Sequence, residues 1–289
     1  MTRQKRDIRK EITNQIIHLI KDHGADWTKP FAALSGAPRN ALTGHRYQGG
    51  NSLWLGLQGQ TYWATFKQWK ELGASVVSGK NSATYISRPV IIKNKETGEV
   101  DALFFNPVPV FSAAQVEGWE PPENLGVTDS TESVAKADAF IEGTGADIRY
   151  SDEDRAYFSP AGDFIHLPHR KYFHATNHSS STVNFYSTIL HELTHWSGGK
   201  SRLDRNRGAK FGDRDYGFEE LVAEIGSCYL SAELSVSSEG VRPDHIQYIS
   251  GWLKALNNDS GFIFDAAKKA QEAVVYLESL QPESLEEAA

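Results

Sequence analysis

The sequence predicts an α+β protein built from two domains. Apolar residues recur at helical spacing near both ends of the chain, two segments around residue 100 alternate like hairpin strands, and a stretch rich in Pro, Gly and acidic residues shows no periodicity. That stretch is expected to be a linker over residues 118–131. It separates a first domain over residues 1–117 from a second over residues 132–289.

The first domain is expected to open with a helix over residues 7–21, because its isoleucines fall on one helical face. Two more helices are expected over residues 51–57 and 61–72. Strands over 83–93 and 100–111, joined by the polar loop 94–99, predict a hairpin.

The second domain is expected to combine a small sheet with helices. The turn sequence Ser-Pro-Ala-Gly at 159–162 predicts a hairpin of strands 156–158 and 163–168, with His166 and His169 facing the surface or a cleft rim. Another strand is expected over 147–150, and helices over 132–142, 183–196, 218–226, 243–256 and 262–280.

Composition excludes several classes of protein. A chain of 289 residues with 39% hydrophobic residues can build real cores, and no apolar run approaches the length of a membrane span. The basic segment 1–10 is not followed by the apolar core of a secretory leader, so a cytoplasmic location is expected. The single cysteine, Cys228, rules out an intrachain disulfide and is expected in the core.

Charge is divided unevenly along the chain. Residues 1–125 contain 15 basic and 11 acidic residues, a net charge of +4, whereas the whole chain has 30 basic and 37 acidic residues. The remainder, residues 126–289, therefore carries −11. A basic first part joined to an acidic second part suggests that a polyanion meets the first part.

The motif His-Glu-Leu-Thr-His at 191–195 lies inside an expected helix. Two histidines four residues apart project from one helical face, so both imidazoles can reach a single ion. Glu192, next to the first histidine, is then placed to act as the general base for hydrolysis. The motif therefore predicts a zinc site in which His191 and His195 are ligands.

A catalytic zinc site needs a third protein ligand, and the next helix offers two carboxylates on one face. We assign Glu220 as the third ligand and Glu224 as the carboxylate that orients one histidine, with an exchange of these two roles as the alternative. Glu219 points about 100° away from Glu220 and is expected to be solvated. Gly198 and Gly199 suit the end of the first helix. The arginines of the following loop are expected to be solvated, with contact to substrate or nucleic acid as the alternative.

The paired motifs resemble the Glu-type zincin metallopeptidases, in which HExxH is followed by ExxxD or ExxxE. The resemblance implies zinc ligands at His191, His195 and Glu220, and a general base at Glu192. In several such enzymes a tyrosine or histidine near the third ligand helps to stabilise the oxyanion, and Tyr216 is the nearest candidate here, with ordinary packing as the alternative. In zincins an edge strand of the kind expected at 156–168 lines the cleft.

Aromatic and basic residues interleave in the first domain. Single-stranded nucleic acid needs this combination, because cations meet its backbone and flat rings stack on its bases. For any single ring, a place in the core of a small domain is favoured, whereas for the set as a surface, binding is favoured. The candidate DNA-binding residues are Trp27, Lys29, Arg46, Tyr47, Asn51, Lys67, Trp69, Lys70 and Lys80.

Three motifs in the first domain resemble a known family. They are W-x-K-P at 27–30, R-N-x-x-T-G-x-x-Y-x-G-x-N at 39–51 and T-x-x-Q-W-K-x-x-G-A-x-V-x-x-G-K at 65–80. They are similar to the N-terminal domain of ArdC-type antirestriction proteins, which TraC-type conjugative primases share. Together with the zincin-like half, the resemblance implies a protein that binds single-stranded DNA and protects conjugating plasmid DNA from host restriction.

Two hypotheses follow for the role of the metal. In the first, the zinc site is a working peptidase whose targets are proteins met at the DNA, with host restriction enzyme subunits as candidates. In the second, the metal site is structural or regulatory, and protection comes from covering single strands. A primase is rejected, because the sequence shows no acidic constellation for the magnesium ions of polymerisation.

Overall fold

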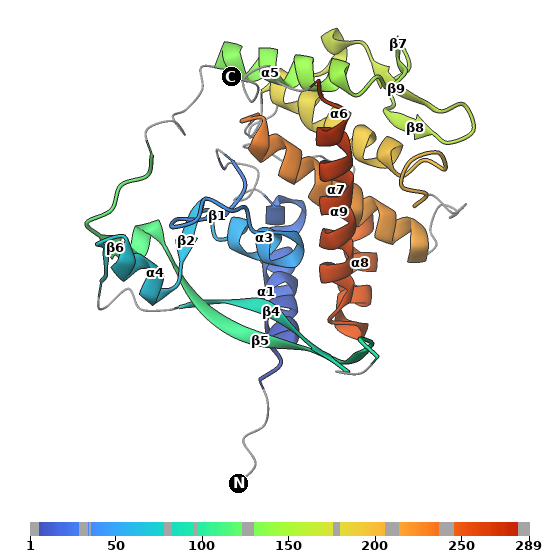
Figure 1. Ribbon diagram of the computed structural model, residues 1–289. Helices are drawn as coiled ribbons and strands as arrows, with labels where there is room; N and C mark the ends of the chain where they lie inside the picture. Colours follow the sequence, from blue (N-terminus) through green and yellow to red (C-terminus); the bar gives the residue numbers. More distant parts are fainter. Residues whose placement is uncertain are drawn as a thin grey trace.

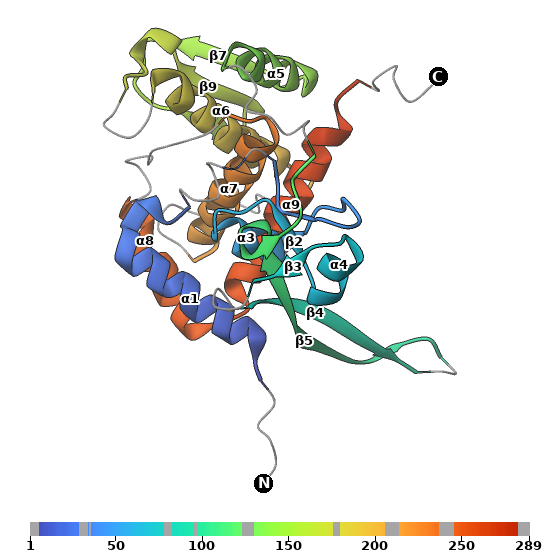
Figure 2. The same ribbon diagram turned by 90° about the vertical axis from the view of Figure 1, so that its left-hand side faces the viewer.

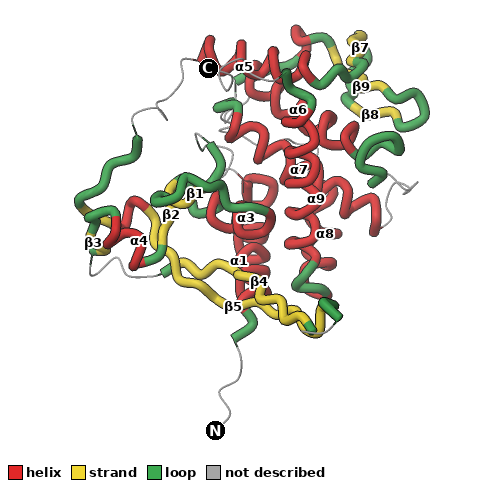
Figure 3. The backbone as a smooth tube through the Cα atoms, viewed as in Figure 1, coloured by secondary structure: helices red, strands yellow, loops and turns green. Residues whose placement is uncertain are grey.

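The structure is a computed structural model that describes residues 6–28, 34, 36–77, 83–94, 97–122, 130–175, 180–205, 214–236 and 246–282. Helices form the body of the molecule, and strands gather in two separate places, one at each side of it (Figure 3). Figure 1 shows two helices of the C-terminal half lying against the N-terminal half: α9 (Phe262–Ser279) packs on α3 (Gly49–Gly56), and α8 (Ile246–Asn258) packs on α1 (Ile8–His23). In the described part of the chain, no helix is both long and apolar enough to cross a lipid bilayer.

The first helix, α1 (Ile8–His23), follows the isoleucine pattern of the sequence. Asp7 caps its start by accepting a hydrogen bond from the backbone N–H of Lys10. The chain leaves the helix at Gly24, whose φ of 57° falls in the left-handed region that favours glycine. The buried isoleucines lie in the main core, and the short helix η1 (Gly24–Thr28) follows directly.

A four-stranded sheet forms the centre of the N-terminal half, with strands in the order β1-β2-β5-β4. Its strands are β1 (Arg39–Asn40), β2 (Tyr62–Ala64), β4 (Thr84–Lys93) and β5 (Val100–Ser112). β1 runs parallel to β2, and the other pairs are antiparallel. The long β4–β5 hairpin reaches away from the helices as an arm (Figure 2). A small pair of strands, β3 (Ser75–Val76) and β6 (Val116–Glu117), lies beyond the short helix η2 (Ala113–Gln115).

The segment expected as one helix over 61–72 is instead a strand and a helix. β2 ends at Ala64, and α4 (Phe66–Glu71) begins after Thr65. Thr65 and Gln68 form a capping box, in which each side chain hydrogen-bonds the other residue's backbone N–H. This cap starts the helix at residue 66 and corrects the expected boundary.

The C-terminal half begins with α5 (Ser130–Gly143) and a three-stranded sheet of order β7-β9-β8. β7 (Ile148–Ser151) runs parallel to β9 (Phe164–Pro168), and β8 (Tyr157–Ser159) pairs antiparallel to β9. The short helix η4 (Arg170–Tyr172) leads on to the long helices. These are α6 (Ser181–Ser197), α7 (Arg214–Glu233), α8 (Ile246–Asn258) and α9 (Phe262–Ser279).

One hydrophobic core runs through both halves of the described chain. Helix α3 (Gly49–Gly56) packs against α9 so closely that Gly50 lies directly under the ring of Phe264. The hydroxyl of Tyr229 on α7 donates a hydrogen bond to the carbonyl of Gly49 at 3.0 Å. The two predicted domains are therefore packed together, although the boundaries of the domains and of the linker stay a prediction.

Candidate metal centre

Helix α6 carries both histidines of the HELTH motif. Ser180 caps its start by accepting a hydrogen bond from the backbone N–H of Val183 at 3.2 Å. Leu190 and Leu193 are fully buried in the core. The two imidazoles turn toward α7, and their Nε2 atoms lie 3.1 Å apart.

Helix α7 brings Glu220 to the two histidines. Glu220 Oε2 lies 3.6 Å from Nε2 of His191, and Oε1 lies 3.5 Å from Nε2 of His195. The two helices approach closely because Gly226 faces Thr194, where a methyl group would lie 2.6 Å from Cγ2 of that threonine. Among the described residues, these three side chains form the group that could hold a metal ion, because one ligand atom from each lies within 4.8 Å of the other two.

The donor set fits a divalent cation. Two imidazole nitrogens and one carboxylate oxygen are the ligands of a catalytic zinc site that keeps an open position. Burial alone raises the pKa of the Glu220 carboxyl, but hydrogen bonds and charge from His191 and His195 outweigh burial and hold that pKa well below its usual range. The carboxylate is therefore kept in the charged form that a metal requires.

The pKa of His195 is raised, whereas that of Glu220 is lowered. Burial lowers the pKa of its imidazole, but hydrogen bonds to Glu219 and Glu220 outweigh burial and raise the pKa to about 10. Each nitrogen of the ring therefore faces a carboxylate, Glu219 at Nδ1 and Glu220 at Nε2. A metal ion at Nε2 would replace the proton there.

Glu192 and Glu224 lie near the ligands and are both buried. Glu192 follows His191 on α6, as the motif requires. Glu224 accepts a hydrogen bond from the Thr28 hydroxyl at 3.3 Å, a contact that joins the N-terminal half to α7. Its proposed role as the orienting carboxylate stays a prediction, as does that of Tyr216, whose side chain lies outside the described residues.

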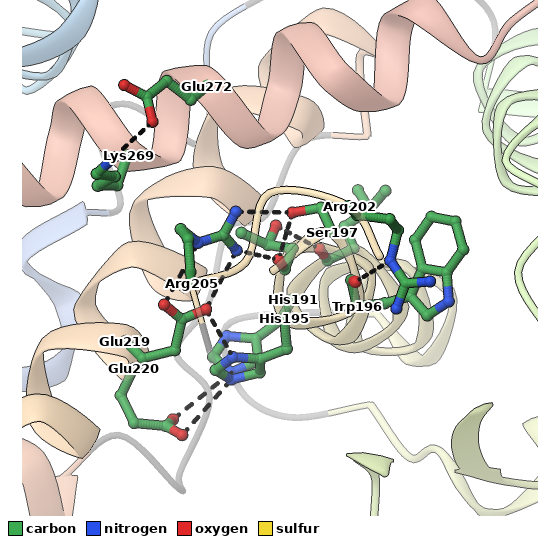
Figure 4. Close-up of polar contacts among 12 residues, drawn as sticks. His191, His195, Trp196, Ser197, Arg202, Arg205, Glu219, Glu220, Lys269 and Glu272 are labelled. Carbon is green, nitrogen blue, oxygen red and sulfur yellow. Dashed lines mark hydrogen bonds and ion pairs between the residues drawn. The ribbon is translucent and has the colours of Figure 1, made fainter. Parts of the chain in front are cut away.

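The expectation that Glu219 is solvated is wrong. Its Oε1 lies 3.5 Å from Nδ1 of His195, and its side chain is only 13% exposed. Arg205 reaches over from the loop between the two helices and pairs with the same carboxylate at 3.1 Å (Figure 4). These two contacts outweigh the desolvation that burial imposes and hold the pKa of Glu219 below its usual range.

Two of the loop arginines, Arg202 and Arg205, have side chains that are only 7% and 5% exposed rather than solvated, and Arg207 lies outside the described residues. Arg205 donates to the carbonyl of Thr194 and Arg202 to the carbonyl of Trp196, so both satisfy the free end of α6. The glycines at the end of α6 make room for them. A methyl on Gly199 would lie 2.1 Å from Nη2 of Arg202, and Gly198 itself has an ordinary φ of −80°.

His166 differs from its expected place at the surface. It is buried, with Nδ1 lying 2.8 Å from the carbonyl oxygen of Arg155 and Nε2 lying 2.7 Å from Oγ of Ser151. Because a carbonyl only accepts, Nδ1 donates to the carbonyl of Arg155, which leaves Nε2 to the contact with the serine hydroxyl. His166 on β9 therefore links β7 and the segment around Arg155 within the small sheet, whereas His169 is exposed.

The two candidate DNA-stacking tryptophans are corrected to core residues. Trp27 is 1% exposed and Trp69 is fully buried, so neither ring is offered to a base. The Trp69 indole donates to the carbonyl of Phe111 and packs edge-on against Trp119. Phe66, another of the aromatic residues interleaved with lysines in the sequence, is 60% exposed on the same short helix.

The remaining candidates fall into three groups. Arg46 pairs with Glu233 and Glu278 of the C-terminal half, and Asn51 exchanges hydrogen bonds with the backbone of Ser87. The half-buried ring of Tyr47 packs on the main core. Lys67 and Lys70 are exposed on α4, whereas Lys29 and Lys80 lie outside the described residues.

A zincin-like fold with a Glu-type ligand set is the class that these helices and side chains define. Two family models match the chain in agreement with this class. The N-terminal domain of the anti-restriction factor ArdC matches residues 6–117, and a zincin-like metallopeptidase model matches residues 135–269.

Two solved structures and one relative match this chain over nearly its whole length. Crystal structures of the antirestriction protein ArdC from plasmid R388, one metal-free and one bound to Mn(II), each superpose with a TM-score of 0.74. They are 36% and 35% identical in sequence and cover 95% of this chain and 98% of theirs. The uncharacterized protein y4eC of Sinorhizobium fredii is 33% identical over 296 residues, which is 96% of this chain and 94% of that protein.

Two DNA primases named TraC, both from Escherichia coli, also match. They are 32% and 30% identical to this chain, which spans only 28% and 20% of their lengths. The chain belongs to the ArdC family of antirestriction proteins.

Proposed function

We propose that this protein binds single-stranded DNA, protects incoming conjugative plasmid DNA from restriction, and uses its metal centre as a zinc metallopeptidase. The observation that carries the peptidase part is the convergence of His191, His195 and Glu220 beside Glu192. Membership of the ArdC family and the TraC relatives support the DNA part.

A divalent metal would be held by Nε2 of each histidine and by the carboxylate of Glu220. When bound, such an ion supplies a Lewis acid that polarises a peptide carbonyl and lowers the pKa of water. Nitrogen and oxygen donors of this kind favour zinc, and the Mn(II) found in the related plasmid R388 protein shows that manganese suits the fold of that relative.

The residues of the chain supply the proton transfers. Glu192 would take a proton from the attacking water and pass it to the leaving amine, because its carboxylate stands beside the first ligand on the same helix. Tyr216, at the start of α7, is proposed to stabilise the oxyanion. The edge strand β8 lies beside α6, where an extended peptide could add to the sheet.

DNA contact is assigned to exposed cations of the N-terminal half. Lys67 and Lys70 on α4 point into solvent, and Lys29 and Lys80 belong to the same family motifs. Phosphates of a single strand would pair with these ammonium groups. Proteins that bind or cut the same DNA, host restriction subunits among them, are the proposed peptidase targets.

One observation favours a second candidate function, in which the metal is structural or regulatory. His191 and Glu220 are both buried between α6 and α7, so a metal there would also clamp the two helices together. On that hypothesis, protection comes from covering the strand and needs no proteolysis.

The test is transfer of a plasmid expressing this chain into recipients with and without an active restriction system. Glu192→Gln keeps the shape of the side chain and all three ligands but removes the proton acceptor. Loss of protection with Glu192→Gln, but not with the exposed control Glu117→Gln, supports the peptidase. Undiminished protection selects the second candidate, and no protection by the wild-type protein overturns both.

A further inference from the structure

We propose that Arg205 and Glu219 are positioning residues that hold His195 in the orientation needed to bind the metal. The inference rests on the metal site of the proposed function and adds two residues to it. Neither residue belongs to the ligand set, and they come from different segments, the loop after α6 and the first turns of α7.

The geometry at His195 separates the roles of its two nitrogens. Nε2 faces His191 and Glu220, and Nδ1 faces the carboxylate of Glu219 at 3.5 Å. When Nε2 binds a metal, Nδ1 carries the proton and becomes a donor. A carboxylate at this position fixes both the tautomer and the rotation of the ring.

Arg205 in turn fixes Glu219. Its Nη2 lies 3.1 Å from Oε1 and its Nε lies 3.4 Å from Oε2, so the guanidinium meets both oxygens of the carboxylate. The arginine side chain is only 5% exposed. A two-point contact of this kind restricts rotation of the carboxylate in a way that a lysine ammonium cannot.

The same guanidinium is anchored to the helix that carries His195. It donates to the carbonyl of Thr194 at 2.5 Å and to the Ser197 hydroxyl at 3.1 Å. Gly198 leaves the space it occupies, since a methyl there would lie 3.0 Å from Nη2. Arg205 thus links the last turn of α6 to α7 beside the ligand pair, as Figure 4 shows.

Arg202 provides a matched comparison on the same loop. It caps the same helix end through the carbonyl of Trp196, stacks on the Trp196 ring at 4.0 Å and pairs with Asp163. Within the part of the chain that the structure describes, Arg202 forms no hydrogen bond or ion pair with the three proposed ligands or with Glu219. A substitution at Arg202 therefore disturbs the loop and the helix end without acting through His195.

The experiment measures the affinity of full-length variants for Zn²⁺ alone, by competition with a chromophoric chelator. We expect Glu219→Gln and Arg205→Lys to weaken binding by about 10- to 100-fold, the usual effect of losing a partner that orients a ligand. Arg202→Lys should stay within about threefold of the wild-type protein, because its contacts stop at the loop. Circular dichroism of each metal-free variant checks that the fold is kept.

A spectroscopic signature separates orientation from general stability. In the zinc-loaded wild-type protein, the Nδ1 proton of His195 should give a downfield, slowly exchanging imidazole resonance, and Glu219→Ala should abolish it. Unchanged zinc affinity of Glu219→Gln, or an equal loss in Arg202→Lys, overturns the inference. If the wild-type protein binds no zinc, the proposed metal site fails, and the inference fails with it.

Discussion

The hydroxyl of Thr28 donates a hydrogen bond to Oε1 of Glu224 at 3.3 Å. Thr28 follows the buried Trp27 in the first half of the chain, and Glu224 lies one turn beyond the ligand Glu220 on α7. The segment that carries the W-x-K-P motif therefore touches the helix that carries the proposed metal ligand Glu220. The two halves share a core, so their stabilities are expected to be coupled.

A substitution between α3 and α9 tests that coupling. Gly50→Ala would place a Cβ 2.2 Å from Cδ1 of Phe264, and we expect this overpacking to lower the free energy of unfolding by about 1–3 kcal/mol. Gly251→Ala on α8, with no atom within 4 Å of the new methyl, should instead raise it by about 0.5–1 kcal/mol. Urea unfolding of the full chain measures both, and a transition of the N-terminal half that is indifferent to Gly50→Ala would contradict the shared core.

Metal analysis separates the two glutamates on α7. Glu220→Ala removes one of three ligands and should lower the zinc content sharply after dialysis, whereas Glu224→Ala should lower it less. Elemental analysis of the purified proteins gives the ratio of zinc to protein. The reverse order would exchange the roles of the two residues.

Zinc affinity should rise with pH. The pKa of His195 in the metal-free protein is raised to about 10, so at pH 7 the imidazole is protonated and must lose a proton to bind the ion. Below about pH 10, this single group adds a slope of about +1 to log K against pH. Calorimetry in buffers of different ionisation enthalpy counts the released protons, and binding without proton release between pH 6.5 and 9 would contradict the assignment.

The salt dependence of DNA binding tests the exposed cations. Lys67→Gln and Lys70→Gln should each weaken binding to single strands of any sequence and flatten the slope of log K against log salt by about one unit or slightly less. Lys269→Gln on α9, whose ammonium pairs with Glu272, is the matched control and should leave the slope unchanged. An unaltered slope in both α4 variants would move the binding face elsewhere.

The convergence of the two proposed histidine ligands could be predicted because their geometry is local. A spacing of four residues places two side chains on one face wherever a helix forms, and this holds for His191 and His195. The roles of Glu219 and Arg205 could not be predicted in the same way. The long loop folds back over the end of α6, and only this fold places a guanidinium beside a carboxylate that helical geometry alone points away.

The sequence favoured a core position for any single ring, but it could not identify which of the aromatic residues are buried. Interleaved rings and lysines have the same pattern whether the rings stack on bases or on one another, and Trp69 packs on Trp119, which is 50 residues away. The start of α4, in contrast, could have been predicted from the sequence. Thr65 and Gln68 stand at the spacing of a capping box, which marks residue 66 as the first of the helix.

Fluorescence anisotropy of the full-length protein tests the central claim most directly. Labelled single-stranded and duplex oligonucleotides of one sequence are titrated over a series of salt concentrations. We predict tighter binding to the single strand than to the duplex, with an affinity that falls as salt rises. Failure to bind single strands at low salt would contradict the account and leave the chain a metal-binding zincin-like protein whose aromatic residues serve only the core.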